Sequence, residues 1–180
     1  MSDGLLLGLS GSLRTESVNR KLVREAARLY GPARFIEADL ALPLYDGDVE
    51  SAEGIPPAVQ VLVDQIEAAE AIVISTPEYN KGPSGVLKNA LDWVSRVKPV
   101  RWADKPVAVM SAAAGRAGGE RAQLILRTFM VPFRARVMAG PEMHLANAAN
   151  QFGEDGQLTS DQYLRTLQEL MDGLKAEVAR

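Results

Sequence analysis

The stretch LLLGLSGSLRTESVNR, residues 5–20, places an apolar run directly before a turn rich in hydroxyls and arginines. The run 5–9 has no polar side chain, which is typical of a strand buried on both faces of a parallel sheet. The runs AIVI (71–74) and VAVM (107–110) have the same character. A strand with one face in water would alternate apolar and polar residues instead. The three runs therefore predict the centre of a parallel sheet that is covered on both faces.

Segments with helical periodicity lie between these runs. Their apolar residues recur at spacings of three and four: Val18, Leu22, Ala26 and Leu29; then Val59, Leu62, Val63 and Ile66; then Leu87, Ala90, Leu91 and Val94. Residues 33–40 and 135–139 are candidate second and fifth strands. The alternation predicts a three-layer α/β fold whose five-stranded parallel sheet has the order 2-1-3-4-5. Because no linker or repeat interrupts the chain, we expect one domain over residues 1–180.

The C-terminal helix has a start signal of its own. Thr159 and Gln162 have the spacing of a capping box, in which two side chains satisfy backbone N–H groups of the first turn. An apolar series from Tyr163 to Leu174 follows at helical spacing. The pattern predicts that this helix starts at Thr159.

Composition excludes several classes of function. The 180 residues include 20 basic and 23 acidic ones, for a net charge of −3, so nothing favours nucleic acid or an anionic membrane as a partner. The chain has no cysteine, which excludes disulfides and thiolate catalysis. No apolar run approaches the roughly 18 residues of a membrane helix, and residues 1–10 lack the basic flank of a targeting segment. We expect a cytoplasmic protein with no membrane partner.

The predicted sheet order also predicts where a ligand binds. In a sheet of order 2-1-3-4-5, the crevice lies at the carboxyl ends of strands 1 and 3, where the winding reverses. The turns that follow strands 1, 3 and 4 are GSLRTESVN (11–19), TPEYNKGPSG (76–85) and SAAAGRAGGE (111–120). These are the most chemically distinctive turns of the chain, and all three would face the same crevice.

The first of these turns suits a phosphate group. Ser17 is a candidate N-cap, so the free N–H groups and the dipole of the following helix would favour an anion at this turn. Ser10, Ser12, Ser17 and Asn19 can donate hydrogen bonds, and Arg14 supplies a positive charge. Neither GxxxxGK[ST] nor GxGxxG is present, which favours a terminal monophosphate over a triphosphate or a dinucleotide. A turn of this kind can also serve only to cap a helix, so this turn alone does not decide between a phosphate site and a simple cap.

The second turn favours a planar ligand. Thr76-Pro77 imposes an extended backbone, after which Glu78, Tyr79 and Asn80 are presented at the crevice. An aromatic residue beside a phosphate site indicates a ring that stacks or lies edge-on against the protein. The alternative is an ordinary loop with an exposed tyrosine.

The third turn is less specific. Gly115, Gly118 and Gly119 allow a ligand to approach the backbone closely, and Arg116 lies between them. Such a turn also commonly does no more than start a helix, here at Glu120. It contributes to the prediction only together with the first two turns.

Three segments together resemble the NADPH-dependent FMN reductase family: GSLRTESVNRKL, TPEYNKGPSGVLKNALDWVSR and GGERAQLILR. PEYN followed by LKNALDW is the specific part, and the resemblance covers essentially the whole chain. It implies a flavodoxin-like fold, FMN as cofactor and NADPH or NADH as co-substrate. It also implies a small-molecule electron acceptor, such as a quinone, an azo compound, chromate or free flavin. Because one crevice would serve both substrates, we expect a ping-pong mechanism.

By position, the resemblance also implies which residues contact FMN. Those near the phosphate are Ser12, Arg14, Ser17, Val18 and Asn19, together with the neighbouring Ser10. Those that flank the ring are Pro77, Glu78, Tyr79 and Asn80, and those that close the other side are Ser111, Gly115 and Arg116. The flavin supplies the chemistry in such a site, so we expect no catalytic side chain and no metal.

The remaining polar and aromatic features are interpreted more simply. His144 has no metal-ligand pattern around it, so we interpret it as structural. The acidic residues of 46–53 lack EF-hand spacing and are expected to solvate a loop. Trp93 and Trp102, beside basic residues, suggest a subunit seam, although either could complete the core. The family resemblance implies a homodimer or homotetramer.

Two other functions remain open from the sequence. A flavodoxin-type electron carrier would share the fold and FMN, but its usual strong acidity is missing here. A cofactor-free phosphate-binding module would have acidic residues at the end of strand 1, where this chain has serines. Flavin absorption of the purified protein separates both redox functions from the module, and NAD(P)H consumption with a quinone separates the enzyme from the carrier.

Overall fold

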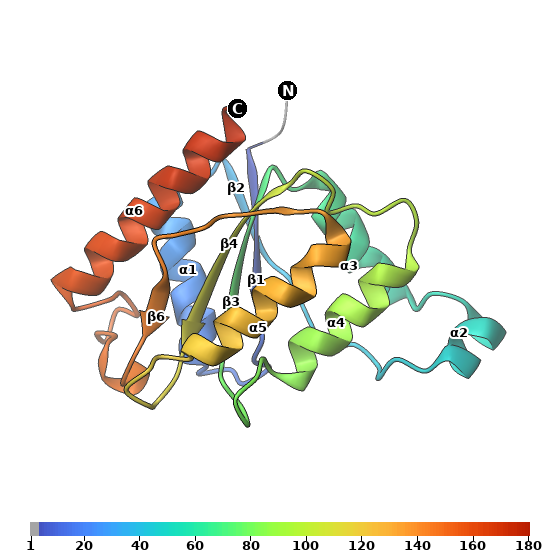
Figure 1. Cartoon of the computed structure of the whole chain (residues 1–180), viewed down its shortest axis with the longest axis horizontal. Coiled ribbons are helices and arrows are strands. Elements are labelled where there is room, and N and C mark those ends of the chain that lie inside the picture. The colour runs from blue at the N-terminus through green and yellow to red at the C-terminus, as the bar shows by residue number, and fades with distance from the viewer. Residues whose placement is uncertain (1–3) are drawn as a thin grey trace.

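The structure is a computed structural model that describes residues 4–180 (Figure 1). The expectation about a targeting segment falls partly on residues 1–3, which lie outside the described residues. The strands of the described chain are β1 (Leu5–Ser10), β2 (Arg34–Glu37), β3 (Ala71–Thr76), β4 (Pro106–Ala112), β5 (Arg136–Val137) and β6 (Met143–Leu145). The helices are α1 (Val18–Tyr30), α2 (Gly47–Glu53), α3 (Pro57–Ala68), α4 (Gly85–Arg96), α5 (Glu120–Met130) and α6 (Asp161–Val178).

The strands form one parallel sheet in the order β2-β1-β3-β4-β5. This confirms the predicted order. The fifth position is divided, however: β5 pairs with the start of β4 at Pro106 and Val107, and β6 pairs with its end from Met110 to Ala112. His144, interpreted from the sequence as structural, therefore lies in β6. The register brings the ends of the central strands together, because Ser10 pairs with Ser75 and Thr76 with Ser111.

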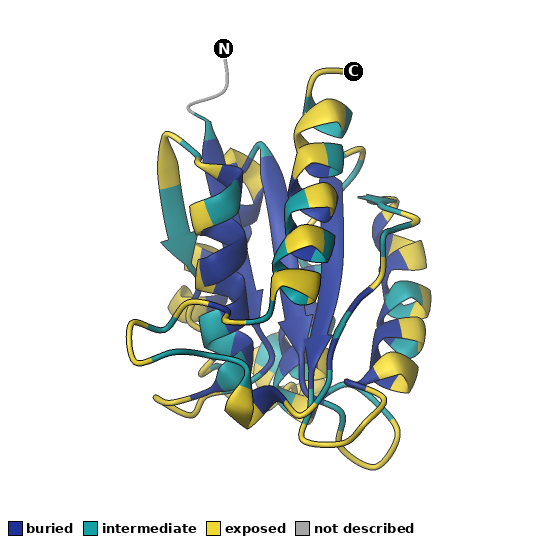
Figure 2. Ribbon diagram, turned by 90° about the vertical axis from the view of Figure 1, so that its left-hand side faces the viewer, coloured by how far each residue is buried: buried dark blue, intermediate teal, exposed yellow. Residues whose placement is uncertain are grey.

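Two apolar layers enclose the sheet, as buried parallel strands require (Figure 2). Every residue of β1, β3 and β4 is buried. One face packs against α1 and α6, with Leu22, Leu167 and Leu170 among its buried residues. The other packs against α3, α4 and α5 and includes Ile66 and Leu126. Within residues 4–180, no helix is both long and apolar enough to cross a membrane.

Two local predictions were wrong. The acidic segment was predicted to be a loop, but Gly47–Glu53 forms α2, whose first turn is capped by the Asp46 side chain. The predicted capping box at Thr159 does not form, because α6 begins at Asp161 with Ser160 as N-cap. The Thr159 hydroxyl instead donates to the carbonyl oxygen of Gln151 at 3.3 Å. A hydrogen bond across the preceding turn thus replaces the local cap.

Of the two interpretations of the tryptophans that the sequence left open, the structure shows that they complete the core. Trp93 is 0% and Trp102 1% exposed, so both belong to the core beneath α3, α4 and α5. Trp93 Nε1 donates to the Pro43 carbonyl oxygen at 2.8 Å, and the Asn89 side chain donates to the same oxygen at 2.9 Å. These bonds hold the segment before α2, and α2 is the helix that lies furthest from the sheet in Figure 1. Through Asn89 and Trp93, the LKNALDW part of α4 therefore fixes the position of this segment.

Candidate functional site

The three distinctive turns meet in one cavity of about 530 Å³ at the carboxyl ends of β1, β3 and β4. Nine of the predicted site residues line it: Ser12, Arg14, Ser17, Val18, Asn19, Pro77, Glu78, Tyr79 and Gly115. The volume lies in the range of about 300–1,000 Å³ that is usual for small-molecule and cofactor sites. The cavity is thus at the place that the predicted strand order indicated.

The first turn directs the N-terminus of α1 toward this cavity. Ser17 has extended backbone angles and its side chain accepts a hydrogen bond from the Asn19 N–H at 3.2 Å, which confirms it as the N-cap. The first turn of a helix leaves N–H groups without intrahelical partners, and the helix dipole adds positive potential there. Ser12, Arg14 and Val18 lie around the same end of the helix. This arrangement favours an anion.

Among the charged residues of the cavity wall, Arg14 supplies the positive charge that an anion needs. Among the described residues that line the cavity, the charged ones are Arg14, Glu16 and Glu78. Glu16 lies 3.4 Å from the ammonium group of Lys21, and Glu78 accepts two backbone hydrogen bonds. Arg14 is exposed and forms no ion pair within residues 4–180. Its positive charge is therefore available to a ligand.

Asn19 lines the cavity, but its side chain is occupied by protein groups. Its Oδ1 accepts from the Ser75 hydroxyl at 2.7 Å and from the Ala112 N–H at 3.2 Å. Its Nδ2 donates to the Ala112 carbonyl oxygen at 3.1 Å. Asn19 is also only 2% exposed. The residue therefore ties α1 to the ends of β3 and β4, and its side-chain oxygen and nitrogen both bond to protein groups.

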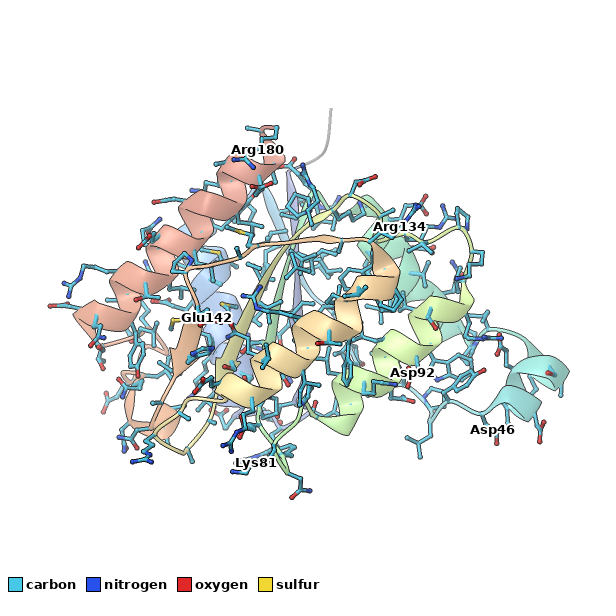
Figure 3. The ribbon with its side chains drawn as sticks, in the orientation of Figure 1. Asp46, Lys81, Asp92, Arg134, Glu142 and Arg180 are labelled. Carbon is cyan, nitrogen blue, oxygen red and sulfur yellow. The ribbon has the colours of Figure 1, made fainter. Side chains whose placement is uncertain are left out.

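The second turn is a tight loop that presents Tyr79. The N–H of Tyr79 donates to the Gly82 carbonyl oxygen and the N–H of Gly82 donates to the Tyr79 carbonyl oxygen, both at 3.0 Å. The two central residues, Asn80 and Lys81, have φ values of 51° and 70°, as in a type I′ turn. Tyr79 is 56% exposed and lines the cavity. Lys81 projects from the tip of the turn at the lower edge of Figure 3.

The third turn passes very close to the sheet. A Cβ atom on Gly118 would lie 2.6 Å from the backbone of His144, and one on Gly119 would lie 2.9 Å from Ser111 Cβ. Both glycines have positive φ, which other residues rarely adopt. Gly115, by contrast, faces open space, because a Cβ atom there would have no neighbouring atom within 4 Å. The turn thus leaves room for a ligand on its outer side.

Four predicted site residues do not line the cavity. Ser10 is 5% exposed and lies on the opposite side of the first turn, where its hydroxyl bonds weakly to the Ser12 carbonyl oxygen at 3.5 Å. Asn80 forms the outer corner of its turn. Ser111 is fully buried against Gly119, and Arg116 is exposed but is not among the residues that line the cavity. Strand alternation and turn curvature, which the motif pattern does not specify, direct these side chains elsewhere.

Several cavity residues were missed by the sequence reasoning. They are Glu16, Ala112, Ala113, Ala114, Ala117, Ala148 and Ala149. Gly118 and Gly119, which also line the cavity, belong to the Gly-rich turn that was expected to let a ligand approach the backbone. The alanines contribute backbone and methyl groups, and Ala148 and Ala149 reach the cavity only because the chain returns there after β6. Within residues 4–180, no group of three or more His, Cys, Asp or Glu could hold a metal ion.

The fold and the site together define a flavodoxin-like α/β protein with an anion-favouring cavity at its topological switch point. The family model for NADPH-dependent FMN reductase matches residues 5–150, and the chain belongs to that family. It is 42% identical to an NAD(P)H-dependent FMN reductase of Pseudomonas aeruginosa, over 100% of this chain and 98% of that protein. It is 41% identical to the quinone reductase of Escherichia coli K12, over 79% of this chain and 78% of that protein.

A solved structure shows the same architecture. The flavoenzyme NAD(P)H:(acceptor) oxidoreductase FerB of Paracoccus denitrificans superposes with a TM-score of 0.88 and 30% identity. The superposition covers 98% of this chain and 97% of that one. The flavodoxin-like fold implied by the sequence resemblance is thereby confirmed over nearly the full length.

Proposed function

We propose that this protein is an FMN-dependent NAD(P)H oxidoreductase that reduces small acceptors, with quinones as the principal class. The observation that carries the proposal is the cavity in which the N-terminus of α1 and the unpaired Arg14 face the turns 77–82 and 113–119. The Pseudomonas aeruginosa and Escherichia coli relatives bear the names of an FMN reductase and a quinone reductase. Azo compounds, chromate and free flavin are further acceptors of the same redox class.

The residues present fit FMN. Its phosphate would lie at the first turn, where Ser12 and Ser17 have hydroxyls and Arg14 has a charge that forms no ion pair with residues 4–180. Its ring would lie between Pro77 and Tyr79 on one side and the open face of Gly115 on the other. When bound, FMN supplies a group that accepts the hydride of NAD(P)H and delivers two electrons to the acceptor, which takes up two protons if it is a quinone. The protein binds and orients the reactants and supplies no covalent catalyst.

A comparison of FMN with riboflavin tests the phosphate site. Arg14→Ala should weaken FMN binding about tenfold, as expected for one charge-assisted contact, and leave riboflavin binding unchanged because riboflavin has no phosphate. Arg134→Ala is the matched control, since Arg134 is also exposed but lies at the opposite end of the molecule in Figure 3. Flavin fluorescence titration measures both constants. Equal losses for FMN and riboflavin, or no loss at all, would place the phosphate elsewhere.

The order of the reaction is proposed to be ping-pong, because one cavity receives both the nicotinamide and the acceptor. Anaerobic NAD(P)H should then bleach the flavin absorption without acceptor, and quinone should restore it. Steady-state rates at several quinone concentrations should give parallel double-reciprocal lines. Intersecting lines would show that both substrates bind together. Bleaching also distinguishes the enzyme from a flavodoxin-type carrier, which would react poorly with NAD(P)H.

We also propose that the chain associates with a second copy of itself, as a homodimer or homotetramer. The buried tryptophans cannot provide the contact, but the segment before and within α2 exposes Leu44 (84%) and Val49 (40%). Its anchorage to α4 gives these apolar side chains a fixed position. Leu44→Asp should shift the mass measured by light scattering to a smaller species. Leu124→Asp, at a 67% exposed site on α5, is the control.

A further inference from the structure

The N-terminus of α5 lacks a capping side chain from its own turn. Its N-cap is Gly119, with φ 90°, and no local side chain bonds to the first turn. A larger residue does not fit there, because a Cβ atom would lie 2.9 Å from Ser111 Cβ. The close approach of the turn to β4 thus requires a glycine, which cannot satisfy the N–H groups of the first helical turn.

Glu78 satisfies them from another part of the chain. Its Oε2 accepts from the N–H of Arg121 at 3.1 Å and from the N–H of Ala122 at 3.2 Å. These are the second and third residues of α5, whose N–H groups an N-cap side chain normally binds. A carboxylate at this position also interacts favourably with the helix dipole. We call this pair of hydrogen bonds the Glu78 cap.

The Glu78 cap connects two walls of the cavity. Glu78 lies in the turn after β3, between Pro77 and Tyr79, whereas α5 begins at the end of the Gly-rich turn. Both turns line the same cavity, and Glu78 itself is part of its wall. Glu78 was predicted to flank the ring, and its carboxylate bonds to the first turn of α5. Two helices begin at this cavity, α1 and α5. The cap occupies N–H groups at the start of α5, so we assign the phosphate to the start of α1.

We propose that Glu78 is a positioning residue, whose carboxylate fixes the distance between the turns 77–82 and 113–119. This distance sets the width of the part of the cavity that binds the flavin ring. The proposal rests on the proposed FMN function. It assigns to Glu78 an action through backbone groups of α5 and not through contact with the reacting atoms. Loss of the cap should weaken the binding of the ring, whichever phosphate or ribityl group the ring carries.

The first experiment measures, in the flavin-free protein, whether the two hydrogen bonds of the Glu78 cap form. Amide hydrogen exchange at Arg121 and Ala122, measured by NMR, should be about tenfold faster in Glu78→Ala. Glu78→Gln should largely restore protection, because its amide oxygen still accepts both bonds. Glu120→Ala is the matched control, since it removes an exposed carboxylate from the same helical turn that makes no hydrogen bond to the described residues. Unchanged exchange in Glu78→Ala would show that the cap does not form.

The second experiment measures how loss of the Glu78 cap changes flavin binding. Glu78→Ala should raise the dissociation constants of FMN and of riboflavin by the same factor, about tenfold, since it acts on the ring and not on the phosphate. Glu78→Gln should bind both nearly as the parent protein does. If Glu78→Ala does not fold, Glu78→Asp carries the test, because it keeps the charge but is one methylene too short to reach both N–H groups.

The outcomes separate this proposal from the proposed function. A parent protein that binds no flavin overturns both. A parent that binds FMN, together with a Glu78→Ala variant that loses amide protection and still binds both flavins normally, overturns only the positioning role and leaves Glu78 as a helix cap. A loss of FMN binding without loss of riboflavin binding would assign Glu78 to the phosphate and also contradict the proposal.

Discussion

Asn19 and Ser75 lie 56 residues apart in sequence, and the Ser75 hydroxyl donates a hydrogen bond of 2.7 Å to the Asn19 side-chain oxygen. Both residues are buried, and the same oxygen also accepts from the Ala112 N–H. One amide thus connects α1 to the ends of β3 and β4, directly beneath the cavity. It holds in place the helix N-terminus that we assign to the phosphate.

This relationship predicts that Asn19→Ala destabilises the flavin-free protein. The substitution leaves a buried hydroxyl and a buried N–H without a partner, which should lower the free energy of unfolding by about 2–4 kcal/mol. Urea denaturation measures this, with Asn150→Ala as control, since Asn150 is exposed and its side chain bonds only to a neighbouring side chain. The control should change stability by less than about 0.5 kcal/mol. Lost FMN affinity with unchanged stability would instead make Asn19 a direct ligand.

The two buried tryptophans predict a difference between matched substitutions. Trp93 Nε1 donates to Pro43, whereas Trp102 Nε1 is buried and finds no hydrogen-bond partner among residues 4–180. Phenylalanine removes the N–H in both cases but breaks a bond only at Trp93. Trp93→Phe should therefore cost about 1–2 kcal/mol more in unfolding free energy than Trp102→Phe. Neither should change the mass in solution, and equal costs would contradict the assigned bonding.

Lys105 predicts a pH dependence of stability. Burial lowers the pKa of its ammonium group, whose hydrogens bond to the carbonyl oxygens of Glu67 and Ala69. Between this lowered pKa and the ordinary value of 10.5, the unfolded chain holds the proton and the folded chain does not. Stability contributed by this group therefore rises with pH across that window and is lost as pH falls through the folded-state pKa.

The comparison that isolates this effect is between the parent protein and Lys105→Met. Burial raises the pKa of Tyr30, which makes stability fall with pH above 10.0 in both proteins, so the difference between their unfolding free energies removes this contribution. That difference should shift in favour of the parent protein as pH approaches 10.5 from below. A difference independent of pH would show that Lys105 titrates normally in the folded state.

The sequence was sufficient for the features that depend on local pattern. A strand buried on both faces must be apolar at each position, so the runs 5–9, 71–74 and 107–110 identified the central strands. Ser17 was recognisable as an N-cap because its partner, the N–H of Asn19, is two residues away. The position of the cavity followed from the strand order alone.

The sequence was insufficient where a side chain chooses between distant partners. Asn19 and Glu78 both line the cavity, but the sequence did not show that their side chains bond to backbone groups of β4 and α5 that are far away in sequence. Asn80 lies in a motif, yet a φ of 51° turns it outward. The division of the fifth strand likewise depends on how residues 138–142 cross the edge of the sheet. Such outcomes depend on the register of packed elements, which residue patterns do not encode.

Substitution of Tyr79 should change the reaction with quinones without changing the binding of the FMN phosphate. The residue lines the cavity and is 56% exposed, and its hydroxyl makes no hydrogen bond to the described residues. Tyr79→Ala should leave stability within about 0.5 kcal/mol of the parent protein, because little packing is lost. It should lower kcat/KM for quinones about fivefold to tenfold by removing an aromatic contact for the acceptor ring.

Tyr79→Phe distinguishes the ring from the hydroxyl. If the aromatic face positions the acceptor, the phenylalanine variant should retain nearly full kcat/KM for quinones, and FMN phosphate binding should be unaffected in both variants. Because Tyr79 projects from a turn closed by two backbone hydrogen bonds, its substitution should not disturb the neighbouring wall. Stopped-flow measurement of the two half-reactions locates the effect: the alanine variant should slow reoxidation by quinone more than reduction by NAD(P)H. Equal slowing of both half-reactions would contradict a contact between Tyr79 and the acceptor, and would mean that Tyr79 acts through its place beside the flavin ring.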